Sequence, residues 1–140
     1  VDLDFSEKRL NIESIHVILG LSLFYLTVLR LIYKFINPTP SLGNSIFTGQ
    51  KLIAKLNHIF LYISVLTITI SGALKKLFNG EILDVFFFDL EIKDNFELAK
   101  LFYNIHVFGN YTLIALISLH ILAIVVHKVL FKENLLKRIL

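Results

Sequence analysis

The chain contains no cysteine among its 140 residues. It can therefore form no disulfide, and it has no thiolate to bind a metal, hold an iron–sulfur cluster or act as a nucleophile. Charge is also scarce, since only 18% of the residues are Asp, Glu, Lys or Arg, against about 25% in soluble domains. No segment matches a glycine-rich phosphate-binding loop or the nucleophile elbow of a hydrolase.

Apolar residues dominate instead. They make up 56% of the chain, and the mean hydropathy is +0.73. A soluble domain of this length has too little interior to bury so many apolar side chains, so the lipid bilayer is the expected solvent. The net charge of +3 comes from scattered basic residues. Because they form no patch or stripe, nucleic acid is not an expected partner.

Three apolar runs are long enough to cross a bilayer, at about residues 15–36, 52–74 and 101–131. Each is too long for a strand and lacks the alternation of one, so each is predicted to be a helix. The fold class is therefore all-α, a transmembrane helical bundle with three spans in one membrane domain, residues 1–140. The connection at residues 75–100 contains three consecutive phenylalanines and predicts an interfacial patch or a short helix.

Charges flanking the spans predict the topology. Eight of the fourteen Lys and Arg residues lie at one end of the spans, where Glu133 is the only acid: Arg30, Lys34, Lys51, Lys55, Lys128, Lys132, Lys137 and Arg138. Ten of the eleven acidic residues lie in the N-terminal segment and in the 75–100 connection. By the positive-inside rule, the chain starts on the outer side of the membrane and ends in the cytoplasm, a multi-pass arrangement. A start on that side without a signal peptide leads us to expect a further helix upstream.

Four histidines lie inside the predicted spans, where ionisable groups usually mark a functional site: His16, His58, His106 and His120. Because His106 and His120 are 14 residues apart, they share a helix face and are separated by about 21 Å along it. His16 begins the first span and His106 begins the third. Since these two spans run in the same direction, the two imidazoles are expected at one depth.

Two neutral imidazoles from facing helices are suitable axial ligands for haem iron. With both axial positions filled, dioxygen has no open site, which favours electron transfer over oxygen activation. Gly20 and Gly109 lie about one turn beyond His16 and His106, where a missing side chain would let the macrocycle approach the backbone. The alternative for both glycines is close packing between helices.

His120 needs a partner near the opposite leaflet. His58 lies at a comparable depth, and the expected upstream helix is the other candidate. Arg30 is 14 residues after His16 and could pair with the propionates of an inner haem, because a guanidinium binds carboxylates through two hydrogen bonds. Its alternative role is to anchor the helix at the lipid interface.

At this point the sequence resembles the bacterial cytochrome b561 family, which is related to the haem-b subunits of membrane hydrogenases and formate dehydrogenases. The similarity covers nearly the whole chain, and no single motif carries it. The order and spacing of these segments do: His16-Val17 with Gly20, Val28-Leu29-Arg30-Leu31, Asn37-Pro38-Thr39-Pro40, His58-Ile59-Phe60-Leu61-Tyr62, Gly72, His106 with His120, Phe131-Lys132-Glu133-Asn134 and Leu136-Lys137-Arg138.

The resemblance implies a four-helix fold with two haems b that passes electrons between a donor and membrane quinone. It implies that His16 and His106 ligate the outer haem. It also implies that His120 ligates the inner haem with a histidine from the family's first helix, which this sequence lacks. On the same basis His58 is not an axial ligand and lies near a haem edge or a quinone site.

Three other functions stay open at this level. The chain could be the haem-b anchor subunit of a larger dehydrogenase or hydrogenase, a cofactor-free membrane protein whose histidines serve packing or proton relay, or a remnant that has lost its first helix. The electron donor, and the choice between a homodimer and a larger redox complex, cannot be read from the sequence.

Overall fold

The computed structural model describes residues 2–38 and 48–130. Three long helices account for most of them: α1 (Asp2–Ile36), α2 (Thr48–Phe78) and α3 (Phe96–Leu130). A small antiparallel hairpin joins α2 to α3, built from β1 (Leu83–Asp84) and β2 (Asp89–Leu90). The connection after the second helix is thus a hairpin and not the short helix that was one of the two expectations.

Each helix contains a stretch long and apolar enough to cross a membrane: Arg9–Ile36, Leu52–Phe78 and Phe96–Val126. The all-α prediction of a transmembrane bundle with three spans is therefore confirmed. The helices extend beyond the predicted spans, and the predicted end of the third span at residue 131 lies outside the described residues. So do three of the basic residues used for the topology: Lys132, Lys137 and Arg138.

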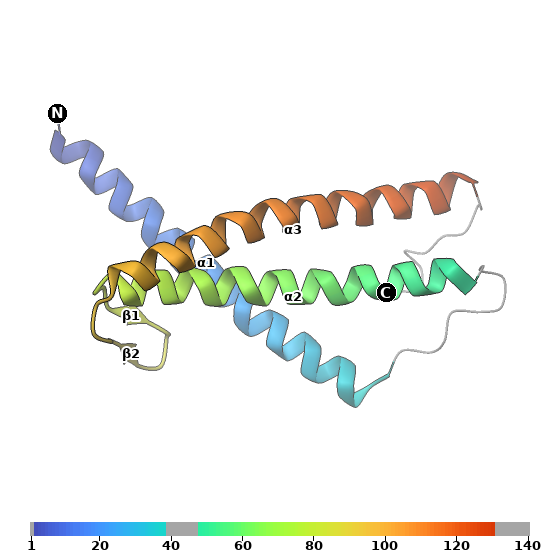
Figure 1. The fold of residues 1–140 in the computed structure, drawn as a ribbon, viewed down its shortest axis with the longest axis horizontal. Helices are drawn as coiled ribbons and strands as arrows, with labels where there is room; N and C mark the ends of the chain where they lie inside the picture. The colour runs from blue at the N-terminus through green and yellow to red at the C-terminus, as the bar shows by residue number, and fades with distance from the viewer. Residues whose placement is uncertain (1, 39–47, 131–140) are drawn as a thin grey trace.

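Helices α2 and α3 run antiparallel and lie side by side, whereas α1 crosses α2 at a steep angle (Figure 1). The apolar stretch of α1 has 28 residues and is about 42 Å long, longer than the roughly 30 Å thickness of the hydrocarbon core. A tilt lets such a helix fit. The inclined path of α1 across α2 agrees with this geometry.

Local sequence explains where the helices end. Pro38 follows α1 and disfavours helical conformation at Asn37. After α2 the chain turns at Gly80, whose φ of 80° is available to glycine without steric cost. At the start of α3 the side-chain oxygen of Asn95 accepts a hydrogen bond of 3.2 Å from the backbone N–H of Leu98. The backbone N–H of Asn95 donates to the carbonyl of Phe78 over 2.8 Å, which holds the two helix ends together.

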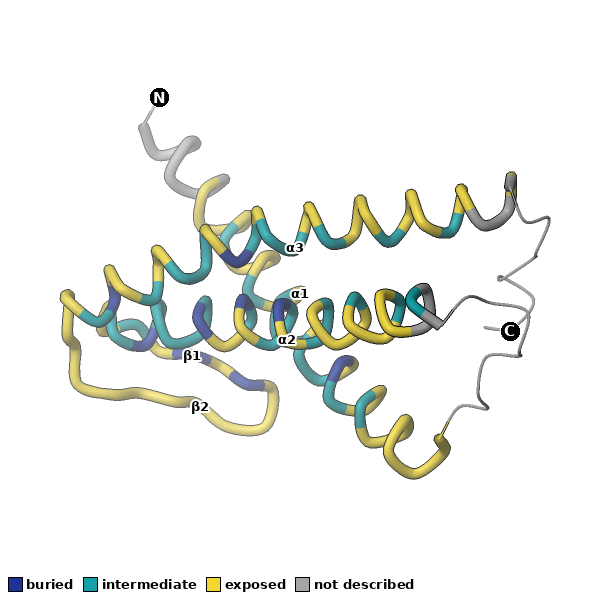
Figure 2. The backbone as a smooth tube through the Cα atoms, turned by 45° about the vertical axis from the view of Figure 1, so that its right-hand side comes forward, coloured by how far each residue is buried: buried dark blue, intermediate teal, exposed yellow. Residues whose placement is uncertain are grey.

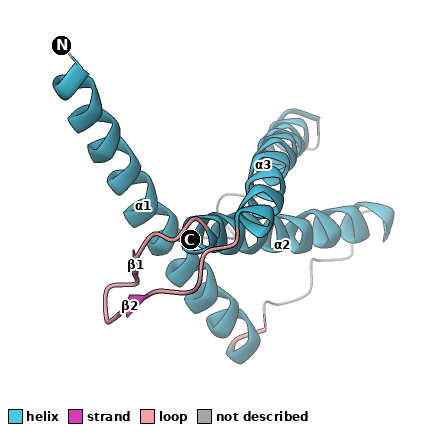
Figure 3. Cartoon of the chain, turned by 60° about the vertical axis from the view of Figure 1, so that its left-hand side comes forward, coloured by secondary structure: helices cyan, strands magenta, loops and turns pink. Residues whose placement is uncertain are grey.

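Few side chains are buried, and most apolar residues of the helices are exposed, as expected where lipid replaces a protein core (Figure 2). The largest buried cluster contains Leu77, Leu83 and Val85, against which Val17, Leu21 and Ala73 pack. It places the hairpin against α1 and the end of α2, as Figure 3 shows from another side. This cluster joins α1, the end of α2 and the hairpin.

Gly109 is buried where α3 meets α2. A Cβ atom added there would lie 2.5 Å from Cγ2 of Ile68, so the glycine allows the two backbones to approach closely. Around Gly20 nothing lies within 4 Å of such an atom. Close packing therefore explains Gly109 and does not explain Gly20.

We expect Gly109→Ala to destabilise the protein by about 1–3 kcal/mol, because the added methyl group must displace Ile68 or separate the helices. Thermal unfolding in detergent, followed by circular dichroism, measures this as a lower midpoint. Gly20→Ala is the matched control for helix propensity and should not lower the midpoint. An unchanged midpoint for Gly109→Ala would show that the α2–α3 contact is looser than described.

Candidate functional site

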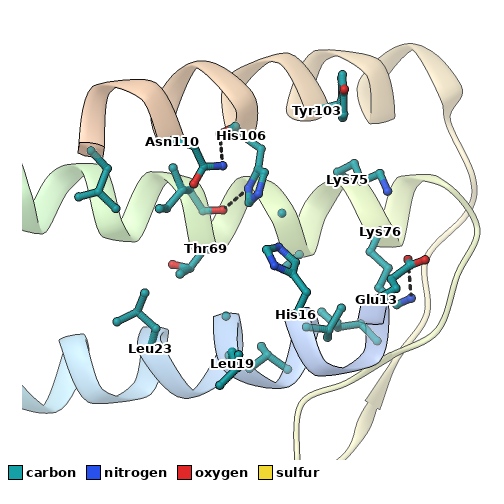
Figure 4. Close-up of a pocket in the computed structure, with 18 residues that line it drawn as sticks. Glu13, His16, Leu19, Leu23, Thr69, Lys75, Lys76, Tyr103, His106 and Asn110 are labelled. Atoms are coloured by element: carbon teal, nitrogen blue, oxygen red, sulfur yellow. Dashed lines mark hydrogen bonds and ion pairs between the residues drawn. The ribbon is translucent and has the colours of Figure 1, made fainter. Parts of the chain in front are cut away.

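The imidazoles of His16 and His106 face each other across the bundle, one from α1 and one from α3 (Figure 4). Their ring centroids are 6.0 Å apart, and the ring planes are inclined by 82°. The sequence had placed the two residues at one depth, and the structure brings them together.

This separation matches a metal ion held between two histidines. An imidazole nitrogen lies about 2 Å from a bound metal, so two rings on opposite sides of one ion have centroids about 6 Å apart. The near-perpendicular ring planes do not conflict with this arrangement, because each ring can rotate about the axis through its own ligand nitrogen. The pair therefore fits an iron with two axial imidazoles.

A backbone hydrogen bond fixes the ring of His106. Its Nδ1 lies 2.7 Å from the carbonyl oxygen of Ile68, and since a carbonyl only accepts, Nδ1 carries the proton and donates it. In a neutral imidazole, Nε2 then keeps its lone pair. Metal-binding histidines commonly have their other nitrogen held in this way.

Gly72 makes room for that ring on the surface of α2. A Cβ atom at position 72 would lie 3.0 Å from both Cε1 and Nδ1 of His106. Any larger residue would push the ring away from α2 and from the carbonyl of Ile68. The sequence marked Gly72 as part of a motif and did not reveal this contact.

A cavity of about 460 Å³ opens beside the two rings. This volume lies within the range typical of ligand and cofactor sites. The charged groups that line it are Glu13, Lys75 and Lys76, whereas most other lining residues are apolar. Gly20 also lines it and faces open space, so a flat ligand can approach the backbone of α1 there. The lining residues from the three helices and the hairpin include Leu19, Leu23, Thr69, Ala73, Leu83, Tyr103 and Asn110.

A second pair of histidines lies toward the other end of α2 and α3. The ring centroids of His58 and His120 are 5.1 Å apart, with planes inclined by 59°. The side-chain amide of Asn57 lies 3.0 Å from Nδ1 of His120. This separation is shorter than the distance of about 6 Å between the centroids of two imidazoles that bind one iron. As they stand, His58 and His120 do not form an axial pair like His16 and His106.

Arg30 lies near this second pair in depth but on α1, with an exposed side chain. One turn further along, Nζ of Lys34 lies 5.1 Å from the ring centroid of Tyr62 on α2, a cation–π contact. Tyr62 is one turn from His58. The basic end of α1 is thereby tied to the part of α2 that carries the second histidine pair.

Within residues 2–38 and 48–130, no three His, Cys, Asp or Glu side chains gather in a way that could hold a metal ion. The arrangement consists of pairs of imidazoles, which suits a cofactor that already supplies four equatorial ligands to its metal. Haem has this property, because the porphyrin leaves only the two axial positions to the protein.

At the mouth of the first cavity, Lys76 Nζ lies 2.6 Å from Oε2 of Glu81 and 3.7 Å from Oε1 of Glu13. The hydrogen bond from Lys76 lowers the pKa of Glu81 below its ordinary value, partial burial opposes this, and a weaker hydrogen bond from Asn79 adds to the lowering. The pair links the base of the hairpin to the last turn of α2.

Because the pKa of Glu81 is lowered in the folded protein, its contribution to stability is present at neutral pH and is lost as the pH falls through the lowered value. We expect Glu81→Gln to reduce the unfolding midpoint slightly at pH 7 and to have no effect at pH values well below about 4. The effect should shrink in high salt, since the pair is partly exposed. Glu13→Gln, which removes the longer contact, is the control and should change the midpoint less. Equal effects of Glu81→Gln at both pH values would contradict the assignment.

Comparison with known proteins identifies the family of the chain. The sequence model of the prokaryotic cytochrome b561 family matches residues 3–140, nearly the whole chain. No curated protein matches it. The match agrees with a bundle of apolar helices that carries paired histidines, and it makes the chain a membrane protein for haem-b electron transfer. The chain belongs to the prokaryotic cytochrome b561 family.

Proposed function

We propose that the chain binds haem b between His16 and His106 and transfers electrons between a donor and the quinone pool of a bacterial inner membrane. The observation that carries the proposal is the His16–His106 pair: rings 6.0 Å apart, with Nδ1 of His106 bonded to a carbonyl and its Nε2 left for iron. When bound, the haem supplies a reversible one-electron couple.

The residues around the site determine which reaction the haem would support. If His16 and His106 both held the haem iron, no coordination site would remain for dioxygen, and the haem would serve electron transfer. The carbonyl of Ile68 orients His106 and increases its basicity through the Nδ1–H bond. The apolar side chains that line the cavity would keep water from the faces of the macrocycle. Gly20 leaves space for the macrocycle beside α1, whereas Gly109 serves the packing of α3 on α2.

A second haem site is proposed at His120. The short distance of 5.1 Å between the ring centroids of His58 and His120 argues against His58 as the second axial ligand. We assign His58 to the haem edge or to a quinone site. Arg30 is the proposed propionate partner, because its side chain is exposed on α1 at the same end.

The charges support an orientation. Arg30, Lys34 and Lys55 lie at the end of the bundle that carries His58 and His120. The hairpin and the start of α3, at the other end, contain all six acids of the described residues after α1, together with Lys93 and Lys100. By the positive-inside rule we place the His16–His106 pair toward the periplasm.

His16→Gly and His106→Gly should each abolish the same low-spin haem-b component in the absorption spectrum of the purified, reduced protein. Each variant removes one axial ligand and leaves a space the size of an imidazole. Added imidazole should restore the six-coordinate spectrum, which a purely structural role of the two residues would not allow. An unchanged spectrum of His106→Gly would refute the proposed ligand pair.

His58→Ala should keep the low-spin spectrum of the His16–His106 haem and slow its reduction by a quinol analogue, by about 10²-fold if His58 accepts a quinol proton. Stopped-flow absorption measures this rate. Reduction by dithionite, which requires no proton acceptor, is the control and should be unaffected. Equal quinol rates in the variant and the wild type would remove His58 from the quinone site and leave the haem assignment intact.

A further inference from the structure

The hairpin between α2 and α3 folds back along the bundle. Leu83 and Val85 are only 2% and 7% exposed and pack on Leu77, while the salt bridge of Glu81 with Lys76 holds the base. The hairpin lies beside α1 and α2 in two views (Figures 1 and 3). It therefore does not extend away from the helices into the aqueous phase.

The tip of the hairpin is attached to α1 at Tyr25. The hydroxyl of Tyr25 donates a hydrogen bond of 3.1 Å to the carbonyl of Val85. The ring of Tyr25 lies 6.0 Å from the ring of Phe86 and 6.2 Å from that of Phe87, measured between centroids. Tyr25 is nine residues beyond His16, about 13.5 Å further along α1, within the apolar stretch Arg9–Ile36. The rings at the tip thus reach the level of the membrane-spanning part of α1.

Phe86 has a backbone conformation that a phenylalanine rarely adopts. Its φ is 74°, in the left-handed region that favours glycine. The turn is held by a 2.7 Å hydrogen bond from the N–H of Phe86 to Oδ1 of Asp84 and by a 3.1 Å bond from Val85 to the carbonyl of Phe88. An aromatic residue in a strained position points to a role for the ring itself.

The three rings are exposed: Phe86 by 47%, Phe87 by 82% and Phe88 by 60%. On α1, Leu29 lies one turn beyond Tyr25 and is exposed, and so is Leu26. Because these leucines belong to a membrane-spanning helix, acyl chains surround them. The same acyl chains are available to contact the three phenylalanine rings.

We propose that Phe86, Phe87 and Phe88 insert into the lipid leaflet at the His16–His106 end of the bundle, so that the hairpin is a shallow re-entrant element. Asp84 and Asp89 are paired across the hairpin and exposed, and they limit the depth of insertion. The Asp84 carboxylate accepts the N–H of Phe86 within the turn, and Asp89 stays at the level of the head groups, while the phenyl rings enter the region of the acyl chains, as aromatic residues of interfacial segments do. This proposal does not depend on the identity of the cofactor.

The absence of cysteine allows a direct test, because a single introduced cysteine is the only site for a nitroxide label. Phe87→Cys is labelled in the full chain with its haem and reconstituted into phosphatidylcholine vesicles. Electron paramagnetic resonance then compares collisions with oxygen, which concentrates in lipid, and with a water-soluble nickel complex. The oxygen-to-nickel ratio at position 87 should be severalfold above that at the aqueous reference Lys93→Cys and close to that at the lipid reference Leu26→Cys.

Two results would overturn the proposal. A ratio equal to that of the Lys93 reference would place the tip in water. An immobilised label that neither reagent reaches would show that a second copy or another protein covers the rings.

A measurement on the unmodified sequence guards against a misfolded variant. Wild-type protein in vesicles that contain a lipid with a photoreactive group in its acyl chain should give lipid adducts on the peptide around residues 86–88. Adducts confined to the three helices would contradict insertion. Loss of the haem spectrum would bear on the proposed function and not on this result, so the two failures are distinguishable.

Discussion

The hydrogen bond between Nδ1 of His106 and the carbonyl oxygen of Ile68 is the contact on which the site depends. It exists because Gly72 has no side chain, which allows an imidazole to lie against the backbone of α2. Within a bilayer, an imidazole N–H without a partner would be costly, since lipid offers no acceptor. The bond meets this requirement and at the same time leaves Nε2 with its lone pair. The position of the His106 ring against α2 and its tautomer are therefore set by one contact.

Both histidine centres, the His16–His106 pair and the His58–His120 pair, are built against α2. Gly72 and His58 are 14 residues apart on α2, and His106 and His120 are 14 residues apart on the antiparallel α3. Equal spacing on two antiparallel helices places one histidine of α3 opposite Gly72 and the other opposite His58. Each centre is thus located near one end of the bundle, about 21 Å from the other along the helices. Close packing at Gly109 keeps this register, because a slip would bring its neighbours against Ile68.

Much of this architecture could be predicted from the sequence. Hydropathy defines three long apolar helices, and the parallel direction of the first and third brings His16 and His106 to one depth. The sequence could not show that Gly72 accommodates His106 or that Asn57 contacts His120, because both contacts depend on how α2 is rotated and shifted against α3. Hydropathy contains no information on that register. The hairpin was missed for a similar reason, since Leu83 and Val85 are buried by α1 and α2 and not by residues near them in sequence.

The inclined path of α1 has a consequence for how the site responds to its surroundings. His106 is fixed to α2 by a backbone hydrogen bond, whereas His16 belongs to a helix that contacts mainly α2 and crosses it at a steep angle. A long tilted helix adjusts its inclination to the thickness of the hydrocarbon layer. Thinner or thicker lipid would then displace one imidazole while the other stays in place. The distance between the two imidazole rings therefore depends on the thickness of the membrane.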